Sequence, residues 1–258
     1  MNILHKIVET KRAEVAAAKQ VISPAMMAEL AAAVTRPTAS LAKSIMKKET
    51  GIISEFKRRS PSKGEIRPMA QVTDIIPGYS EAGAAGISVL TDTPYFGGAL
   101  TDLSVARSLT STPLLRKEFV IDDYQIMEAR VAGADAILLI AAILNDEEIA
   151  KFIATAHSLG LEVLFETHNE EEAARIPHGV DLVGVNSRNL NSFETSLDVA
   201  RRMIDKLPAN AVKIAESGIH SPGDIAMLKG AGFDGFLIGE AFMSTPSPAE
   251  TLKTYLKS

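Results

Sequence analysis

Short apolar segments alternate with longer segments of mixed polarity from residue 52 to the end of the chain. The short segments are rich in Ile, Leu, Val and Phe, and most of them end at a polar or charged residue. Near-continuous apolar segments are typical of parallel strands buried on both faces, and the stretches between them are long enough for crossover helices. The eight segments are 52–57, 86–91, 113–119, 136–140, 162–167, 182–187, 212–217 and 235–240. The pattern predicts an α/β protein with a (β/α)8 barrel.

Helix-start and helix-stop signals stand between these expected strands. A side-chain acceptor before a helix satisfies free N–H groups of the first turn, and proline is tolerated at that turn. Such signals occur at Ser221-Pro222, Ser247-Pro248, Asn145 with Glu148, and Thr195 with Asp198. Glycines that can end a helix in the left-handed conformation occur within 81–86, 131–135 and 230–235. We therefore expect a helix after each strand.

The chain length of 258 residues suits one barrel with an addition. A TIM barrel typically needs about 250 residues and can be built from about 200. We expect residues 49–258 to form the barrel as a single domain. Residues 1–48 are then an N-terminal helical extension, with breaks at Ser23-Pro24 and Arg36-Pro37, that covers one end of the barrel. A doubly wound open sheet is the main alternative, but neither a G-x-G-x-x-G segment after the first strand nor a P-loop is present.

Composition narrows the function classes. The chain has no Cys, which excludes disulfides, thiolate metal sites and thiol catalysis. A net charge of −5 argues against a general nucleic-acid binder. The longest apolar run, 136–144, is far shorter than the roughly 20 residues that span a bilayer as a helix. Charged residues interrupt 1–20, so we expect no signal peptide and a cytoplasmic protein.

Polar side chains stand at the ends of the expected strands, where barrels of this type place their active sites. Because side chains alternate along a strand, residues two apart share a face, so several of these charges can point into the barrel mouth. A single strand-end charge is more often a solvated or structural group. A matching set on different strands favours an active site. The set is Glu55, Lys57, Lys117, Glu166, Asn186, Arg188, Glu216 and Ser217.

Two further features suit an anionic ligand. The segment 57–67 holds five basic residues in an otherwise acidic chain. It is either a solvated loop or a cover over the barrel mouth that attracts an anion. Ser217-Gly218 and Gly239-Glu240 follow the last two strands, where barrels frequently bind phosphate with backbone N–H groups. Glycine lets the backbone approach phosphate oxygens, although it also serves simple turns.

The histidines and aromatic residues give weaker signals. The five histidines are scattered and show no metal-ligand spacing, so we expect no metal site. His168, two residues after Glu166, is the one histidine near the candidate site. Tyr95-Phe96 and Phe119 could line a pocket for a ring, or simply pack within loops.

The chain resembles the indole-3-glycerol phosphate synthase family over essentially its whole length. The matching motifs, in the family's order, are E-F-K-R-R-S-P-S-K-G (55–64), T-D-x-x-Y-F-G-G (91–98), L-L-R-K-E-F (114–119), E-A-R-x-x-G-A-D-A-I-L-L-I (128–140), F-E-T-H (165–168), G-V-N-S-R-N-L (184–190), E-S-G-I (216–219) and G-F-L-I-G-E (235–240). The resemblance places catalytic positions at Glu55, Lys57, Lys117, Glu166, Asn186 and Ser217, with Ser60 and Arg188 as substrate contacts.

The resemblance implies a carboxy-lyase of tryptophan biosynthesis. Its reaction closes the pyrrole ring of 1-(2-carboxyphenylamino)-1-deoxyribulose 5-phosphate with loss of CO₂ and water, giving indole-3-glycerol phosphate. Lys117 is the first choice for general acid and Glu166 for general base. Lys57 is expected to hold the substrate carboxylate or phosphate and to share acid duty, while Glu55 orients a lysine.

The resemblance also implies how the substrate is held. We expect Asn186 and Arg188 to position the sugar hydroxyls and the benzoate, and N–H groups near the last two strand ends to bind phosphate. Some relatives have Ser in place of Glu240, next to the phosphate, so we expect the glutamate side chain to turn away from the phosphate and leave only its backbone N–H as a donor. The remaining contacts are expected from Ser60, Pro61, Phe96, Phe119, Leu138, Glu216, Gly218, Leu237 and Gly239.

Other functions stay open at this point, because a barrel alone does not define one. A different isomerase or an aldolase on a phosphate-binding barrel is one alternative, and a non-catalytic metabolite-binding barrel is another. Phosphoribosylanthranilate isomerase is disfavoured because it uses a Cys that this chain lacks. We expect a monomer that acts on a phosphorylated small molecule without a cofactor, a nucleic acid or a membrane.

Overall fold

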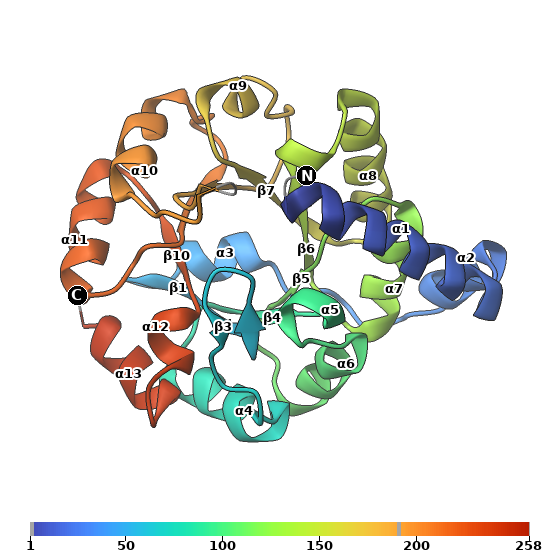
Figure 1. Cartoon of the computed structure of the whole chain (residues 1–258), viewed down its shortest axis with the longest axis horizontal. Helices are drawn as coiled ribbons and strands as arrows, with labels where there is room; N and C mark the ends of the chain where they lie inside the picture. The colour runs from blue at the N-terminus through green and yellow to red at the C-terminus, as the bar shows by residue number, and fades with distance from the viewer. Residues whose placement is uncertain (1–2, 190–191, 258) are drawn as a thin grey trace.

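The computed structural model describes residues 3–189 and 192–257. Its eight main strands are all parallel and close into a barrel in the order β1-β10-β9-β8-β7-β6-β5-β4 (Figure 1). The strands are β1 (Gly51–Phe56), β4 (Gly86–Leu90), β5 (Leu114–Lys117), β6 (Ala136–Ile140), β7 (Glu162–Thr167), β8 (Leu182–Asn186), β9 (Val212–Glu216) and β10 (Gly235–Ile238). Each overlaps a predicted segment, so the (β/α)8 prediction is confirmed and the open sheet is excluded.

The helices form a ring outside the strands, and both strand faces are therefore buried. The longer helices of the ring are α4 (Val72–Ala82), α6 (Leu100–Leu109), α7 (Asp123–Ala132), α8 (Asp146–Ser158), α10 (Leu197–Met203), α11 (Pro222–Ala231) and α13 (Pro248–Tyr255). Shorter turns are α5 (Thr93–Phe96), η1 (Ala141–Ile143), α9 (Glu170–Ala173), η2 (Ile204–Lys206) and α12 (Glu240–Met243). No described helix is long and apolar enough to cross a membrane.

Most of the predicted helix signals work as expected. Asn145 and Ser221 each form a capping box with the acidic residue three positions later. Gly83, Gly133 and Gly232 end their helices in the left-handed conformation. The prediction at Thr195 was wrong: that residue pairs with Arg188 in an isolated bridge, which holds it in extended chain, and α10 starts two residues later.

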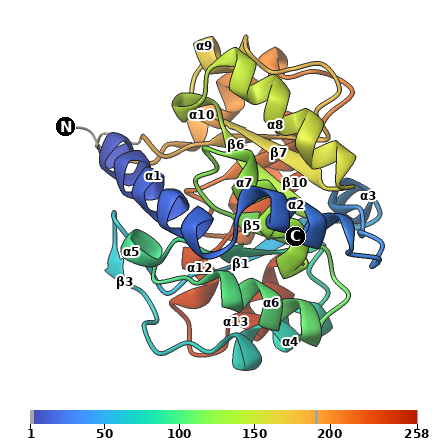
Figure 2. The same cartoon turned by 90° about the vertical axis from the view of Figure 1, so that its right-hand side faces the viewer.

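The N-terminal residues form three helices, α1 (Ile3–Val21), α2 (Pro24–Ala32) and α3 (Leu41–Met46). Leu41 and Ile45 of α3 are fully buried against the barrel interior at the amino ends of the strands. Helix α1 lies at the opposite end of the barrel, beside α5 and β3 (Figure 2). We expected the extension to cover one end. It contacts both, because the linker after α2 runs along the outside of the barrel, where Arg36 pairs with Asp135.

The basic segment after β1 is an ordered hairpin over the barrel mouth (Figure 1). Its strands are β2 (Arg59–Ser60) and β3 (Gly64–Glu65), which pair antiparallel. Arg58 anchors the hairpin: its guanidinium pairs with Asp102 and lies 4.9 Å from the centre of the Phe56 ring. The hairpin therefore has a fixed position relative to the strand ends.

Candidate active site

A cavity lies at the carboxyl ends of the strands, under the hairpin and beside α1. Every residue that the sequence analysis proposed for catalysis or substrate binding lines it, although they come from all eight barrel strands or the loops after them. The lining includes Glu55, Lys57, Ser60, Pro61, Phe96, Lys117, Phe119, Leu138, Glu166, Asn186, Arg188, Glu216, Ser217, Gly218, Leu237, Gly239 and Glu240. Closing the barrel is what gathers them, because parallel strands present all their carboxyl ends at one mouth.

Lys117 lies between two buried carboxylates. Its Nζ is 3.1 Å from Glu166 Oε2 and also pairs with Glu216 Oε2. Burial disfavours the ammonium, but Glu216, Glu166 and the more distant Glu55 outweigh it and raise the pKa of Lys117 well above its usual range. Lys117 is therefore fully protonated at neutral pH and stands ready as a proton donor.

The two carboxylates differ in protonation. Burial raises the pKa of Glu216 to about 7, because Lys117 only partly offsets the desolvation and the nearby Glu166 adds to the rise. Glu166 is buried too, but Lys117 and His168 outweigh that effect and lower the pKa of Glu166 below its usual range. Glu166 is thus held ionised. The sequence analysis treated Glu216 as a substrate contact, whereas here its side chain pairs with Lys117.

A second lysine–glutamate pair lies on β1 and the chain just after it. Lys57 Nζ donates to Glu55 Oε1, and both side chains are largely buried. Gly239 follows β10 beside this pair, and a side chain at that position would overlap the Glu55 carboxylate. Glu55 can therefore orient Lys57 only because residue 239 has no Cβ.

The side chain of Glu240 extends toward the hairpin and Arg188 at the cavity rim. Its Oε1 lies 3.1 Å from Lys63 Nζ of the hairpin, and its Oε2 lies 3.6 Å from Arg188 Nη2. The two cations attract the carboxylate to the cavity rim. Asn186 Oδ1 accepts the backbone N–H of Arg188 at 3.0 Å, which holds the chain just after β8 in place.

The chain turns sharply after β9. Ser217 and Gly218 both have positive φ, 65° and 76°. Positive φ is strained for a serine, and such strain concentrates at functional sites. Consecutive residues of this kind expose backbone N–H groups beside the cavity, at the position that the sequence analysis assigned to phosphate.

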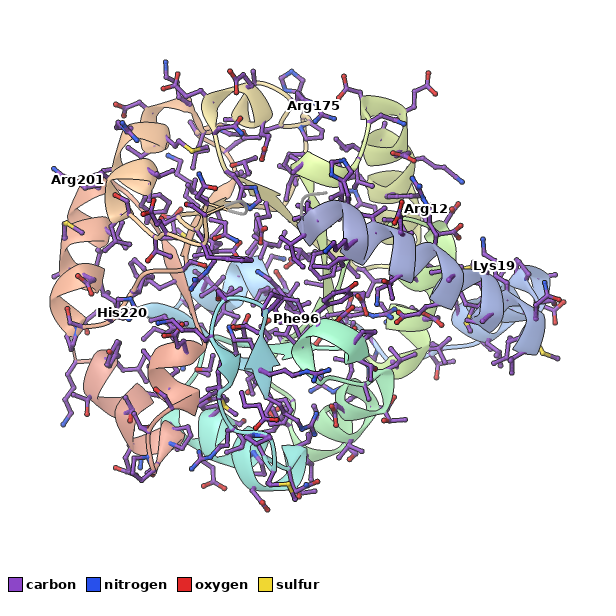
Figure 3. The ribbon with its side chains drawn as sticks, in the orientation of Figure 1. Arg12, Lys19, Phe96, Arg175, Arg201 and His220 are labelled. Carbon is purple, nitrogen blue, oxygen red and sulfur yellow. The ribbon has the colours of Figure 1, made fainter. Side chains whose placement is uncertain are left out.

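An apolar wall stands opposite the charged groups. The rings of Phe96 and Phe119 lie 5.9 Å apart, and Figure 3 shows Phe96 between the hairpin and α5. Ile3, Leu4 and Ile7 of α1 add to this cavity lining. The sequence analysis missed them, although their helical spacing in the first helix was visible.

Lys11 was also missed. This lysine of α1 is only 4% exposed, and its Nζ lies 3.0 Å from both Asp92 Oδ2 and Glu118 Oε1. Asp92 also caps α5 by accepting the N–H groups of Tyr95 and Phe96. Lys11 therefore ties α1 to the two loops that carry the aromatic wall. Its position in an otherwise apolar helix stripe is the signal that could have revealed it.

The described residues hold no group of three or more His, Asp or Glu side chains that could bind a metal ion.

Sequence comparison identifies close relatives. A sequence model of the indole-3-glycerol phosphate synthase family matches residues 4–255. The chain is 46% identical over 257 residues to the indole-3-glycerol phosphate synthase of Bacteroides thetaiotaomicron, covering 100% of this chain and 98% of that protein. It is 43% identical over 255 residues to the synthase of Albidiferax ferrireducens, covering 97% of each chain.

More distant solved structures share the fold. One is 3-hexulose-6-phosphate synthase from Salmonella typhimurium, with a TM-score of 0.64 and 14% identity over 81% of this chain and 97% of that chain. Another is a mutant tryptophan synthase alpha-subunit from Pyrococcus furiosus, with a TM-score of 0.58 and 16% identity over the same shares of the two chains. At such identities the likeness concerns the barrel alone.

Proposed function

This chain belongs to the indole-3-glycerol phosphate synthase family, carboxy-lyases of tryptophan biosynthesis, and we propose that the cavity at its barrel mouth carries out their ring closure. The substrate is 1-(2-carboxyphenylamino)-1-deoxyribulose 5-phosphate. The product is indole-3-glycerol phosphate, with CO₂ and water released. The buried ammonium of Lys117, held by Glu166 and Glu216 opposite an apolar wall, is the observation that carries the assignment to these residues.

The first step needs an acid. The ring carbon that bears the carboxylate attacks the ketone carbon, and the ketone oxygen gains a proton as the bond forms. Lys117 supplies this proton, because its ammonium is the buried cation between the two acidic strand ends. Loss of CO₂ then returns the electron pair to the ring and restores its aromaticity.

Dehydration needs a base and a second proton donor. Once Lys117 has given up its proton, Glu166 loses a neighbouring positive charge and its pKa rises, so it becomes able to take a proton from carbon. Lys57, oriented by Glu55, can protonate the departing hydroxyl. Glu216, whose pKa lies at about 7, fixes the position of Lys117.

The remaining lining residues hold the substrate. The phosphate lies on backbone N–H groups of Ser217, Gly218, Gly239 and Glu240, next to Leu237. Asn186 and Arg188 contact the sugar hydroxyls and the carboxylate, with Ser60 beside them. The aromatic ring lies against Pro61, Phe96, Phe119 and Leu138.

An aldolase mechanism is less well supported. Schiff-base formation requires a neutral amine. Lys117 is instead stabilised as an ammonium by two carboxylates, and its pKa is raised rather than lowered.

We further propose that the protein works as a cytoplasmic monomer on a phosphorylated small molecule, with no cofactor, nucleic acid or membrane. The net charge of −5 supports the absence of a nucleic-acid partner. Residues 1–48 and 49–258 act as one structural unit in this proposal, because α1 and α3 pack on the two ends of the same barrel.

The test is direct. Purified protein is given the carboxyphenylamino ketose phosphate, and indole fluorescence is followed; the chain has no Trp to obscure the signal. Lys117→Ala is expected to abolish turnover while the circular dichroism spectrum is unchanged. Lys151→Ala, at a 62% exposed lysine on α8, is the matched control and retains full activity. A folded Lys117→Ala protein with near-normal kcat would refute the acid assignment.

A further inference from the structure

His168 connects the candidate base to a second cavity. The residue directly follows β7, and its side chain is only 9% exposed. Nε2 lies 3.2 Å from Glu166 Oε1, while Nδ1 lies 3.0 Å from Glu172 Oε2. That Glu172 oxygen also accepts the backbone N–H of His168 at 2.8 Å, which holds Glu172 beside the ring. The imidazole thus bridges two carboxylates.

The contacts continue from this bridge to Lys117. Lys117 Nζ is 3.1 Å from Glu166 Oε2, so Lys117, Glu166, His168 and Glu172 form a line with at most 3.2 Å between neighbours. Every group in the line can carry a proton. Substrate binding does not account for this line of groups, because Glu172 does not line the main cavity.

The end of this line at Glu172 borders a second cavity. His168 and Glu172 line a second cavity of about 670 Å³, bounded by α1 and the loops after β6, β7 and β8. Its volume accommodates many water molecules, given about 30 Å³ for each. Its other charged or titratable lining groups are His5, Arg12, Arg188 and Glu194. Glu166 lines only the main cavity, so His168 stands between the two.

The proposed reaction consumes one proton from solvent in each turnover. The ketone oxygen takes up two protons and leaves as water, and one proton is lost from the carbon next to nitrogen. The carboxylate departs as CO₂ and leaves its electron pair on the ring. Glu166 can return the proton taken from carbon, but the second proton must enter from outside. Lys117 is only 13% exposed and faces the bound substrate in this proposal, so a second route can reload it while the main cavity is occupied.

We propose that His168 is a positioning residue that relays this proton from the second cavity, through Glu172 and Glu166, to Lys117. The inference rests on the proposed function. The imidazolium gives its Nε2 proton to Glu166 and keeps its Nδ1 proton. The ring then turns over, presents its free nitrogen to Glu172 and the second cavity, takes up the next proton there and turns back. Glu166 passes the proton on to the neutral amine of Lys117.

The charges around His168 suit this task. Burial disfavours the imidazolium, but Glu166 and Glu172 outweigh it and raise the pKa of His168 to about 10. Glu216 and Glu166 also raise the pKa of Lys117, so its neutral amine readily takes up a proton. At neutral pH His168 is charged and ready to donate.

The experiment compares the first turnover with later ones. His168→Gln keeps a hydrogen-bond donor beside Glu166 but cannot carry a proton onward. Lys117 starts protonated, so rapid mixing is expected to show one equivalent of indole product at the wild-type rate. The steady-state kcat then falls on the order of 100-fold, the size typical of a lost proton-transfer group, and KM falls with it, because kcat/KM reports the unaffected first turnover. Added imidazole restores the steady-state rate in proportion to its concentration.

Two further variants make the test decisive. Glu172→Gln breaks the same line beyond His168 without touching Glu166, and it is expected to give the same burst and the same slow steady state. His157→Gln is the matched control, because that histidine is 40% exposed and pairs with Asp181 away from the site. It is expected to behave as wild type.

The outcomes separate the two proposals. Equal slowing of the first and later turnovers without imidazole rescue would mean that His168 only holds Glu166 in place, and it would overturn the relay. An unchanged steady-state kcat in both variants would also overturn it. If the wild-type protein forms no indole product, the proposed function fails and the relay fails with it.

Discussion

The shape of the site depends on two residues without side chains. A Cβ at Gly184 would overlap Glu216, and a Cβ at Gly239 would overlap Glu55. The carboxylates of Glu216 and Glu55 occupy the space that these Cβ atoms would fill, and this lets them reach Lys117 and Lys57. The acidic residues and the glycines beside them therefore form one functional arrangement at the residue scale.

Replacement of Gly239 by Ala tests this arrangement. The methyl group is expected to push Glu55 away from Lys57 and to lower kcat/KM by about 10- to 100-fold, since a displacement of about 1 Å in an active site can cost that much. Steady-state assays of the folded variant measure the effect.

The matched control is Gly230→Ala, where the added methyl group meets no atom within 4 Å. It lies inside α11, so alanine there is expected to preserve activity and slightly raise stability. Wild-type kcat/KM in Gly239→Ala would show that the position of Glu55 does not matter.

Sequence patterns located the site residues but not their pairing. Strand alternation and strand ends were enough to predict that Lys117, Glu166 and Glu216 face one mouth. Lys117 stands on β5 and Glu216 on β9, which are not adjacent in the barrel. Which side chains meet across the interior depends on the stagger of the closed barrel, and no local pattern encodes that stagger.

At the scale of elements, α1 is a wall of the active site as well as a surface helix. Its buried residues are Leu4, Ile7, Lys11 and Val15, a helical stripe in which one member is charged. Lys11 is stabilised there by Asp92 and Glu118, which raise its pKa beyond the usual range despite burial. The helix is thus tied to the barrel by an ion cluster as well as by apolar contacts.

Lys11→Met is expected to loosen α1. It removes the cation that lies 3.0 Å from both Asp92 and Glu118. Among the described residues, Glu118 then keeps only its ion pair with Arg116 at 3.8 Å. Breaking a buried pair in this way typically costs about 3–5 kcal/mol of unfolding free energy. Because α1 lines the cavity, KM is expected to rise more than kcat falls. Urea denaturation and steady-state kinetics measure the two effects.

Lys6→Met is the matched control, because Lys6 lies on the exposed face of the same helix. Its unfolding free energy is expected to change by less than about 0.5 kcal/mol. Equal stability of the Lys11→Met and Lys6→Met proteins would contradict the anchoring role.

The main strands were predictable because parallel strands buried on both faces leave a clear apolar signal. The hairpin was not, since β2 and β3 have two residues each and carry no such signal. The path of the extension was also missed. Leu41 and Ile45 belong to a helix of six residues, too short for its packing partner to be inferred from periodicity.

At the scale of the whole molecule, a net charge of −5 coexists with a local basic segment over the cavity. The structure divides the basic residues of 57–67 by role. Arg58, Arg59 and Arg67 hold the hairpin through hydrogen bonds to neighbouring loops. Lys57 and Lys63 pair instead with carboxylates that line the cavity, so they are placed to meet an anion.

This distribution predicts that added salt lowers kcat/KM for an anionic substrate. The negative net charge alone would predict the opposite, because salt would screen its repulsion of the substrate. Raising NaCl from about 0.05 M to about 0.3 M is expected to lower kcat/KM several-fold, because salt screens the attraction between substrate and the basic rim. Lys63→Gln is expected to reduce the slope. Lys229→Gln, at an exposed lysine of α11, leaves it unchanged. Identical slopes in all three proteins would rule out steering by the hairpin.

The N-terminal extension, residues 1–48, contacts both ends of the barrel and therefore also affects the order of the folding steps. Ile45 packs against Gly51 at the start of β1 and Gly235 at the start of β10, so its docking surface is incomplete until the first and last strands pair. Residues 1–48 are synthesised before that surface exists, and contacts so distant in sequence form slowly. We therefore expect helix α3 to dock late during folding. Activity should return during refolding only after the ends of the chain have met, later than most of the helical signal.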